Sequence, residues 1–184
     1  MIVGGAGGVG SILIQLARRL TGLTVLATAT RPESQKWCLD LGAHAVIDHG
    51  KPMKEQIEKL KVPPVALVAR LTFTDQHYKA IADLIAPQGK FGLIDDPQEF
   101  SVSVFKGKAV SVHWESMFTR SSFQTPDMIA QHNLLNDVAD LIDKGVLRTT
   151  LDQTLGTINA ANLKRAHTLL ESGKSRGKIV LEGW

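Results

Sequence analysis

Residues 1–20 read MIVGGAGGVGSILIQLARRL, and this stretch decides the fold. A short apolar strand runs directly into a glycine-rich loop, and a helix follows from Ser11 with no linker. A strand that ends in G-x-G-x-x-G and turns at once into a helix aims free backbone N–H groups at a space that only main chain can approach. The pattern therefore predicts a dinucleotide site, formed by Gly5, Ala6, Gly7, Gly8, Val9 and Gly10.

Each glycine of the pattern has its own expected task. Gly5 permits the tight turn, Gly7 lets a diphosphate touch the main chain, and Gly10 lets the helix pack closely on the strand. A glycine-rich turn of purely structural use is the alternative. The strand before the loop favours the site, as do the apolar residues after it, Ile12, Leu13, Leu16, Ala17 and Leu20. Because the loop begins at residue 4, we expect the chain to begin inside a fold, as a piece of a longer protein.

Length and composition limit the remaining possibilities. The 184 residues allow one sizeable core and an appendage, and 43% hydrophobic with 21% charged residues is typical of a globular protein. No apolar run reaches the ~20 residues of a membrane span, and no signal peptide is recognisable. The lone Cys38 predicts no disulfide and no zinc site, so we expect a cytoplasmic location. The net charge of +3 is dispersed and aromatic residues are few, which favours an anionic cofactor over nucleic acid.

Apolar strand patterns alternate with helical patterns along the chain, as in a parallel sheet with helices on both faces. The expected fold is α/β, a Rossmann-type doubly wound, mostly parallel sheet of six strands. After the loop strand, the expected strands cover residues 24–29, 45–48, 65–69, 90–94 and 109–114. The expected helices between and after them begin near Pro32, Lys51, Asp75, Pro126 and Asn159.

Four segments together resemble a known family. They are IVGGAGGVGSILIQLAR, LGAHAVIDH, IAPQGKFGLIDDP and LKRAHTLLESGKSRGKIVLEGW, and the resemblance covers essentially the whole chain. They resemble medium-chain dehydrogenase/reductases, in the zinc-type alcohol dehydrogenase-like and quinone oxidoreductase branch. The resemblance implies a cofactor domain over residues 1–149. Residues 150–184 would be a tail that returns to an N-terminal catalytic domain, which this sequence lacks together with the family's zinc ligands.

Cofactor choice is predicted from the end of the second strand. NAD enzymes usually place a carboxylate about 20 residues beyond the glycines, to bind the ribose 2′-hydroxyl. Here Thr30 and Arg31 stand at that place, and Lys36 follows. Since Arg31 and Lys36 can bind a 2′-phosphate, NADP is expected and NAD is the less favoured choice. Glu33 is the nearest acid, and it serves the helix dipole equally well.

Residues beyond the glycine loop and the second strand give weaker signals for a functional site. Ile94 is assigned to the cofactor at the end of its strand, whereas Asp95 and Asp96 are explained better as a turn than as a site. In the resembled family an aromatic residue just beyond the sixth strand lies over the nicotinamide, and Phe118 matches it, with an ordinary core or interface aromatic as the alternative. His113 is interpreted as structural. Trp37 is interpreted as packing. Tyr78 lacks the lysine that short-chain reductases place four residues on.

The resemblance implies hydride transfer between NADPH and a carbonyl, quinone or activated alkene, with little activity for this chain alone. The alternative is a non-catalytic NADP(H)-binding module, acting alone or as a dimer. A methyltransferase is a third possibility, but it would place an acid after the second strand. No catalytic residue and no metal ligand are assigned. We expect a homodimer through residues 110–117 and partly exposed apolar residues in the tail region, namely Leu147, Leu151, Leu155, Ile158, Ile179 and Leu181.

Overall fold

The computed structural model describes residues 1–183, which form two compact units. We call Ile2–Leu60 with Thr149–Trp184 the loop unit, and Met1 with Lys61–Arg148 the edge unit. Six strands form one sheet in the order β3-β2-β1-β4-β5-β6, and β7 and β8 form a second, two-stranded sheet. The predicted α/β fold with a mostly parallel six-stranded sheet is confirmed.

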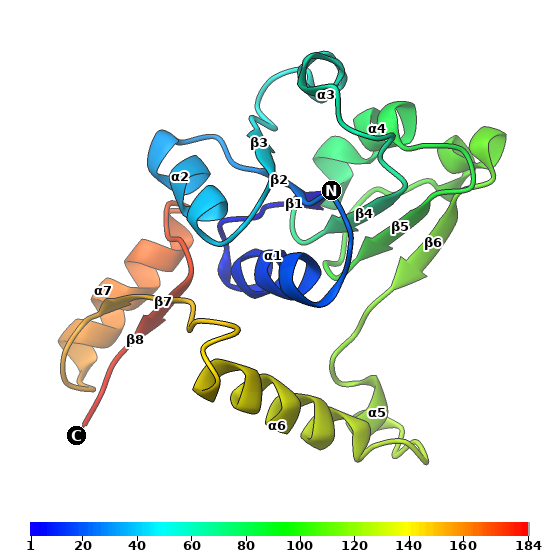
Figure 1. Cartoon of the computed structure of the whole chain (residues 1–184). Coiled ribbons are helices and arrows are strands. Elements are labelled where there is room, and N and C mark those ends of the chain that lie inside the picture. Colours follow the sequence, from blue (N-terminus) through cyan, green and yellow to red (C-terminus); the bar gives the residue numbers. More distant parts are fainter. Residues whose placement is uncertain (184) are drawn as a thin grey trace. The chain divides into compact units, whose positions relative to one another are not determined.

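The loop unit holds the phosphate-loop region and the C-terminal segment (Figure 1). Parallel pairs join β1 to β2 and β2 to β3, and β7 pairs in parallel with β8. Its elements are β1 (Ile2–Val3), α1 (Gly8–Leu20), β2 (Leu26–Thr28), α2 (Pro32–Asp40), β3 (Ala45–Ile47), α3 (Met53–Leu60), β7 (Leu151–Thr154), α7 (Ala160–Glu171) and β8 (Lys178–Val180).

The edge unit continues the same alternation of strands and helices. The strands β4, β5 and β6 pair in parallel, and β6 is the last strand of the sheet order. Phe91 stacks on Phe105 with ring centroids 5.0 Å apart, and Tyr78 and Phe100 extend this aromatic core. The unit's elements are β4 (Leu67–Arg70), α4 (Thr74–Leu84), β5 (Lys90–Leu93), the 3-10 helix η1 (Val102–Lys108), β6 (Ser111–Trp114), α5 (Thr119–Ser122) and α6 (Ala130–Asp143).

The buried face of α1 differs from the predicted one. Ser11, Ile14 and Gln15 are buried, whereas the residues expected to face the core are half-buried and Leu20 is exposed. The close contact at Gly10 explains the rotation, because a Cβ there would lie 2.5 Å from the Gly4 carbonyl oxygen. The helix therefore turns its glycine and serine side toward β1.

The apolar residues of the tail region are partly exposed, as expected, with one exception. Leu151 is exposed, and Leu155, Ile158, Ile179 and Leu181 are half-buried. Leu147 is only 2% exposed, so that part of the prediction is wrong. Leu147 follows the end of α6, where its backbone N–H donates to the carbonyl of Leu141. This local turn fixes the backbone at Leu147, whose side chain is buried.

Candidate functional site

The phosphate loop, residues 4–10, is fixed at its first two residues by hydrogen bonds to Thr28. The N–H of Gly4 donates to Oγ1 of Thr28 at 3.1 Å, and the N–H of Gly5 donates to the Thr28 carbonyl at 3.0 Å. A Cβ on Gly5 would lie 2.9 Å from the Ala27 Cβ. Gly5 and Gly10 therefore leave no room for a side chain, in agreement with the tight turn and close packing predicted for them.

The N-terminus of α1 is open to an anion. Its N-cap is Gly7, no side chain caps it, and its first turn holds no acidic residue. The first N–H groups of a helix have no intrahelical partner, and the helix dipole adds partial positive charge there. A Cβ on Gly7 would have only one neighbour within 4 Å, at 3.6 Å, so the space beside this residue is open. The backbone can thus be approached closely by a phosphate group.

Lys178 adds a cation at the same place, and the sequence analysis missed it. A Cβ on Gly8 would lie 2.7 Å from Cε and 3.0 Å from Nζ of Lys178, so this side chain lies directly against the start of α1. A cation beside the positive end of a helix is unfavourable unless an anion lies between them or close by. The only signal in the sequence was the basic Arg176-Gly177-Lys178 run before the last apolar segment.

The residues predicted to select the cofactor follow β2. Thr30 is exposed, and Arg31 is the N-cap of α2. The Arg31 guanidinium pairs with the Glu33 carboxylate at 2.7 Å and donates to the carbonyl oxygen of Lys174 in the C-terminal segment. Lys36 pairs with Asp40 at 2.7 Å on the surface of α2. Both cations, which follow β2 closely in sequence, are therefore paired with carboxylates in this structure.

The edge unit holds the other predicted residues. Ile94 follows β5 and is 39% exposed, and Phe118 is the N-cap of α5 and is 64% exposed. Both side chains are thus accessible. Their accessibility fits either a ligand contact or the ordinary interface alternative that the sequence left open for Phe118.

Asp95 does more than form the predicted turn. Its carboxylate accepts hydrogen bonds from the backbone N–H of Thr74 at 2.8 Å and from the Thr74 hydroxyl at 2.6 Å. It therefore caps α4, whose own N-cap, Phe73, has a φ of 53° and offers no capping side chain. The turn interpretation of Asp95 left this capping role out. The sequence could not show it, because the two residues lie on different βα connections.

A buried arginine lies beside this cap. Arg70, at the end of β4, is 1% exposed and donates through Nη2 to the Phe73 carbonyl at 2.7 Å. Its Nε has no hydrogen-bond partner. Burial lowers the pKa of the guanidinium to about 10, although Asp95 and Asp75 oppose the shift. The group remains charged at neutral pH, so Asp95 also offsets a buried positive charge.

Within residues 1–183, no three His, Cys, Asp or Glu side chains are grouped so that they could hold a metal ion. The described residues therefore offer no ligand set that fits a zinc ion. The same residues include no helix that is long and apolar enough to cross a bilayer.

Comparison with known proteins gives consistent matches. Residues 41–181 match the family described as zinc-binding dehydrogenase. A zinc-type alcohol dehydrogenase-like protein of Staphylococcus aureus is 36% identical over 182 residues, covering 98% of this chain and 54% of that protein. The chain thus spans about half the length of the curated relatives it matches.

Solved structures show the same relationship. A protein from Rhizobium etli, described as a zinc-dependent alcohol dehydrogenase, is 60% identical, with a TM-score of 0.95 over 100% of this chain and 54% of that one. The quinone oxidoreductase of Escherichia coli, solved with NADPH, is 21% identical, with a TM-score of 0.80 over 98% of this chain and 55% of that one. At that identity, the second likeness shows the fold alone.

Proposed function

Because the chain belongs to the zinc-binding dehydrogenase family, we propose that it is the NADP(H)-binding portion of an oxidoreductase. The observation that supports this most directly is the uncapped N-terminus of α1 with the Lys178 ammonium beside it. An anion of the size of a pyrophosphate would satisfy the first-turn N–H groups and neutralise the lysine. The E. coli quinone oxidoreductase, which has the same fold, was solved with NADPH.

When bound, the nicotinamide ring would supply the hydride chemistry, and the protein would supply position and polarity. In this proposal the N–H groups of the phosphate loop and the Lys178 ammonium bind the pyrophosphate. The bare Cα of Gly7 lets the phosphate oxygens approach the main chain. Ile94 and Phe118 are proposed contacts of the nicotinamide end.

The preference for NADPH over NADH is proposed from the residues after β2. Ala29 and Thr30 carry no charge that would repel a 2′-phosphate, and Arg31 and Lys36 are cations. Glu33 and Asp40 neutralise those cations in the unliganded chain. A bound 2′-phosphate would exchange these exposed ion pairs, each worth roughly 0–1 kcal/mol, for a dianionic partner.

The substrate class is proposed to be a carbonyl, quinone or activated alkene, reduced by hydride from NADPH. We propose that residues 1–149 are the cofactor domain and that residues 150–184 normally return to a catalytic domain elsewhere in a longer protein. This chain spans about half of the length of its curated relatives. Substrate turnover by these 184 residues alone is therefore expected to be weak or absent.

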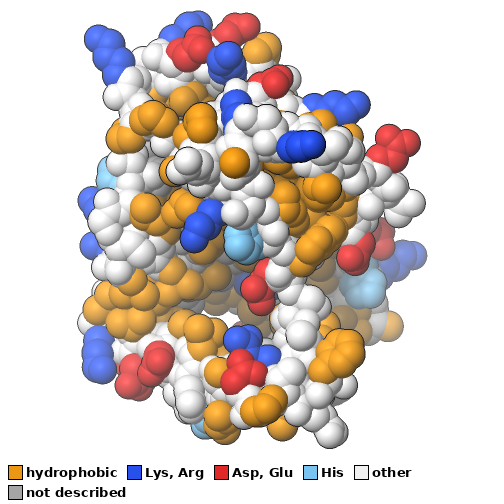
Figure 2. All heavy atoms as spheres, turned by 90° about the vertical axis from the view of Figure 1, so that its right-hand side faces the viewer, with side chains coloured by type: hydrophobic (Ala, Val, Ile, Leu, Met, Phe, Trp, Pro, Cys, Tyr) orange, Lys and Arg blue, Asp and Glu red, His pale blue; other side chains and the backbone are white. Residues whose placement is uncertain are grey.

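A homodimer in the cytoplasm is also proposed, through the β6 edge. This strand is an edge strand of the six-stranded sheet, and Trp114, its last residue, is 58% exposed. Met117, just beyond the strand, is also exposed, and hydrophobic side chains gather on the face of the molecule drawn in Figure 2. An uncovered edge strand with apolar neighbours is a common pairing surface.

The test is calorimetric titration of the chain with NADPH, NADH and S-adenosylmethionine, paired with intact mass spectrometry of the protein from its source. We expect saturable binding of NADPH, weaker binding of NADH and none of S-adenosylmethionine. Binding of S-adenosylmethionine alone would refute the proposal in favour of a methyltransferase. A native mass near 20 kDa with NADPH binding would favour the non-catalytic module, and a larger native protein would favour the reductase.

A further inference from the structure

The C-terminal segment contacts the phosphate loop through Gly177. Its N–H donates to the Ala6 carbonyl at 2.8 Å, and the neighbouring Lys178 N–H donates to the Thr150 carbonyl at 2.7 Å. Gly177 has a φ of 53°, and a Cβ there would collide with the Thr150 carbonyl and lie 3.0 Å from the Trp37 ring. A glycine is therefore needed where this segment passes the loop.

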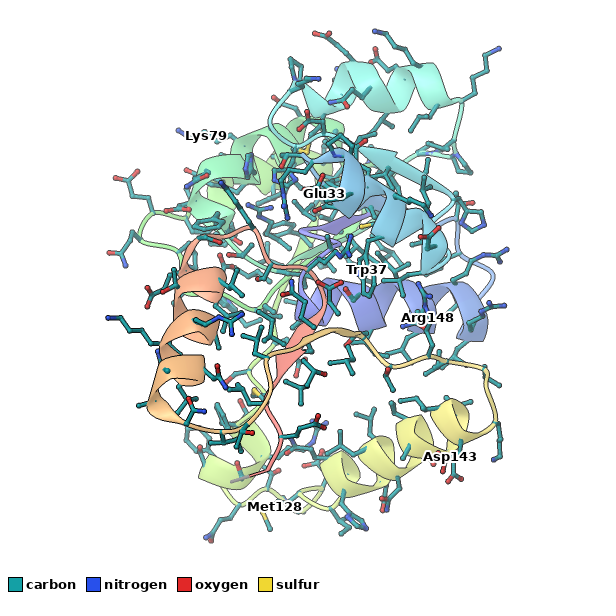
Figure 3. All side chains as sticks on the ribbon, turned by 90° about the vertical axis from the view of Figure 1, so that its left-hand side faces the viewer. Glu33, Trp37, Lys79, Met128, Asp143 and Arg148 are labelled. Carbon is teal, nitrogen blue, oxygen red and sulfur yellow. The ribbon has the colours of Figure 1, made fainter. Side chains whose placement is uncertain are left out.

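The same Ala6 carbonyl is held from a second side. It accepts a hydrogen bond from Oγ of the buried Ser11 at 3.2 Å, and that oxygen in turn accepts from Nε1–H of Trp37 at 2.8 Å. Figure 3 shows Trp37 reaching from α2 toward α1. Two donors thus use both lone pairs of the Ala6 carbonyl. Trp37, interpreted as packing, also acts as a hydrogen-bond donor.

Arg176 fixes the indole from the side of the C-terminal segment. Its guanidinium lies 5.3 Å from the centroid of the Trp37 ring, in a cation–π arrangement. Its Nε donates at 2.7 Å to Asp152, whose side chain is 5% exposed. Asp152 belongs to β7. Its carboxylate orients the Arg176 guanidinium, and the guanidinium orients the Trp37 indole. The indole N–H in turn orients the Ser11 hydroxyl beside the loop.

The orientation of the Ala6 carbonyl matters for an anion. A carbonyl oxygen that turned toward the start of α1 would repel phosphate oxygens, and it would compete for the N–H groups that should bind them. Ser11 is fully buried whereas Gly7 is exposed, so the hydrogen bonds from Ser11 and Gly177 hold the negative end of this carbonyl on the buried side of the helix start, away from the exposed Gly7. The geometry points to Trp37 and Arg176 as positioning residues for the pyrophosphate of the dinucleotide, acting through Ser11 and Ala6. This inference rests on the proposed function.

The test uses the whole chain with three probes, namely NADPH, ADP-ribose and adenosine 2′-monophosphate. The first two contain a pyrophosphate and the third does not. Trp37→Phe keeps an aromatic ring for Arg176 but removes the N–H that donates to Ser11. Arg176→Met removes the positive charge and keeps a side chain of similar length. Arg165→Met on the exposed surface of α7 is the matched control, and Arg176→Lys tests rescue of the charge.

For Trp37→Phe and Arg176→Met we expect affinity for NADPH and ADP-ribose to fall about tenfold, the scale of one lost hydrogen bond or cation–π contact in a partly buried site. Affinity for adenosine 2′-monophosphate should stay within about twofold, and Arg176→Lys should recover part of the loss. Equal weakening of all three probes would reveal a merely structural role and overturn the inference, as would unchanged binding. Failure of the unmodified chain to bind NADPH and ADP-ribose would instead refute the proposed function, and this inference with it.

Discussion

The carboxylate of Asp95 caps helix α4 by accepting two hydrogen bonds from Thr74, one from its backbone N–H and one from its hydroxyl. The acid follows β5, whereas the helix that it caps follows β4. The loops after these two neighbouring strands are thereby joined, and Arg70 is placed beside a negative charge.

Replacement of Asp95 by alanine should lower the free energy of unfolding by about 1–3 kcal/mol, because it removes a charged cap and leaves a buried guanidinium less compensated. Urea unfolding monitored by circular dichroism measures the loss. Asp96→Ala is the matched control, since Asp96 is exposed, and it should change stability by no more than about 0.5 kcal/mol. Equal effects of the two variants would contradict the capping role.

Gly10→Ala should destabilise the chain strongly. A Cβ at this position would lie 2.5 Å from the Gly4 carbonyl oxygen and 2.6 Å from that of Gly5, and both obstacles are main chain. We expect a loss of about 3 kcal/mol or more, the upper range of overpacking in a core. Gly22→Ala provides the control, because a Cβ there would meet nothing within 4 Å. The urea midpoints of the two variants should separate clearly, and a stable Gly10→Ala protein would disprove the close packing of α1 on β1.

Cys38 should be unreactive in the folded chain. It is fully buried, and burial raises the pKa of its thiol to about 12, so almost no thiolate exists at pH 8. Labelling with Ellman's reagent should proceed only as fast as the chain opens, and it should become rapid in urea. Fast labelling of the native protein would contradict the close packing of Cys38 against Gly5 of the loop.

The same group predicts a pH dependence. The pKa of the thiol rises from 9.0 in the unfolded chain to about 12 on folding, so the folded form holds its proton more tightly. Its contribution to stability is complete below pH 9 and decreases as the pH rises from 9 to 12. The decline in the free energy of unfolding across pH 9–10.5 should therefore be shallower in Cys38→Ala than in the unmodified chain. An identical decline would contradict the buried thiol.

The strands and their parallel order were predictable because local patterns encode them. Alternation of apolar runs with helical spacing located all six strands, and the boundary of β4 moved only from 65–69 to Leu67–Arg70. The rotation of α1 was not predictable, since the contact of Gly10 with the Gly4 carbonyl sets it, and periodicity cannot report such a contact.

The glycines of the site were found from a local motif, but their partners were not. Lys178 lies against Gly8 although 170 positions separate them, and Arg176 meets Trp37 from the other end of the chain. Nothing in the spacing of residues encodes such approaches, because they depend on where β7 and β8 lie beside the loop. The pairing of Arg31 with the Lys174 carbonyl is non-local in the same way.

Lys178→Met should weaken NADPH binding by about tenfold, the value of one charge-assisted contact, and should reduce the salt dependence of binding. Titrations at low and high ionic strength measure both effects. Lys164→Met, on the exposed surface of α7, is the control and should bind as the unmodified chain does. If Lys178→Met bound NADPH with unchanged affinity, the ammonium would have no part in the pyrophosphate site.

The most direct test of the pyrophosphate site is calorimetric titration of NADPH into the unmodified chain and into Gly7→Ala. A Cβ on Gly7 would meet only the Gly4 carbonyl oxygen, at 3.6 Å, so this variant should fold with a loss of stability of no more than about 1 kcal/mol. The methyl group would nevertheless occupy the space where the diphosphate touches the main chain. We expect saturable binding by the unmodified chain and an affinity at least tenfold lower in Gly7→Ala. Equal affinity of the two proteins, or no binding by either, would contradict the pyrophosphate site.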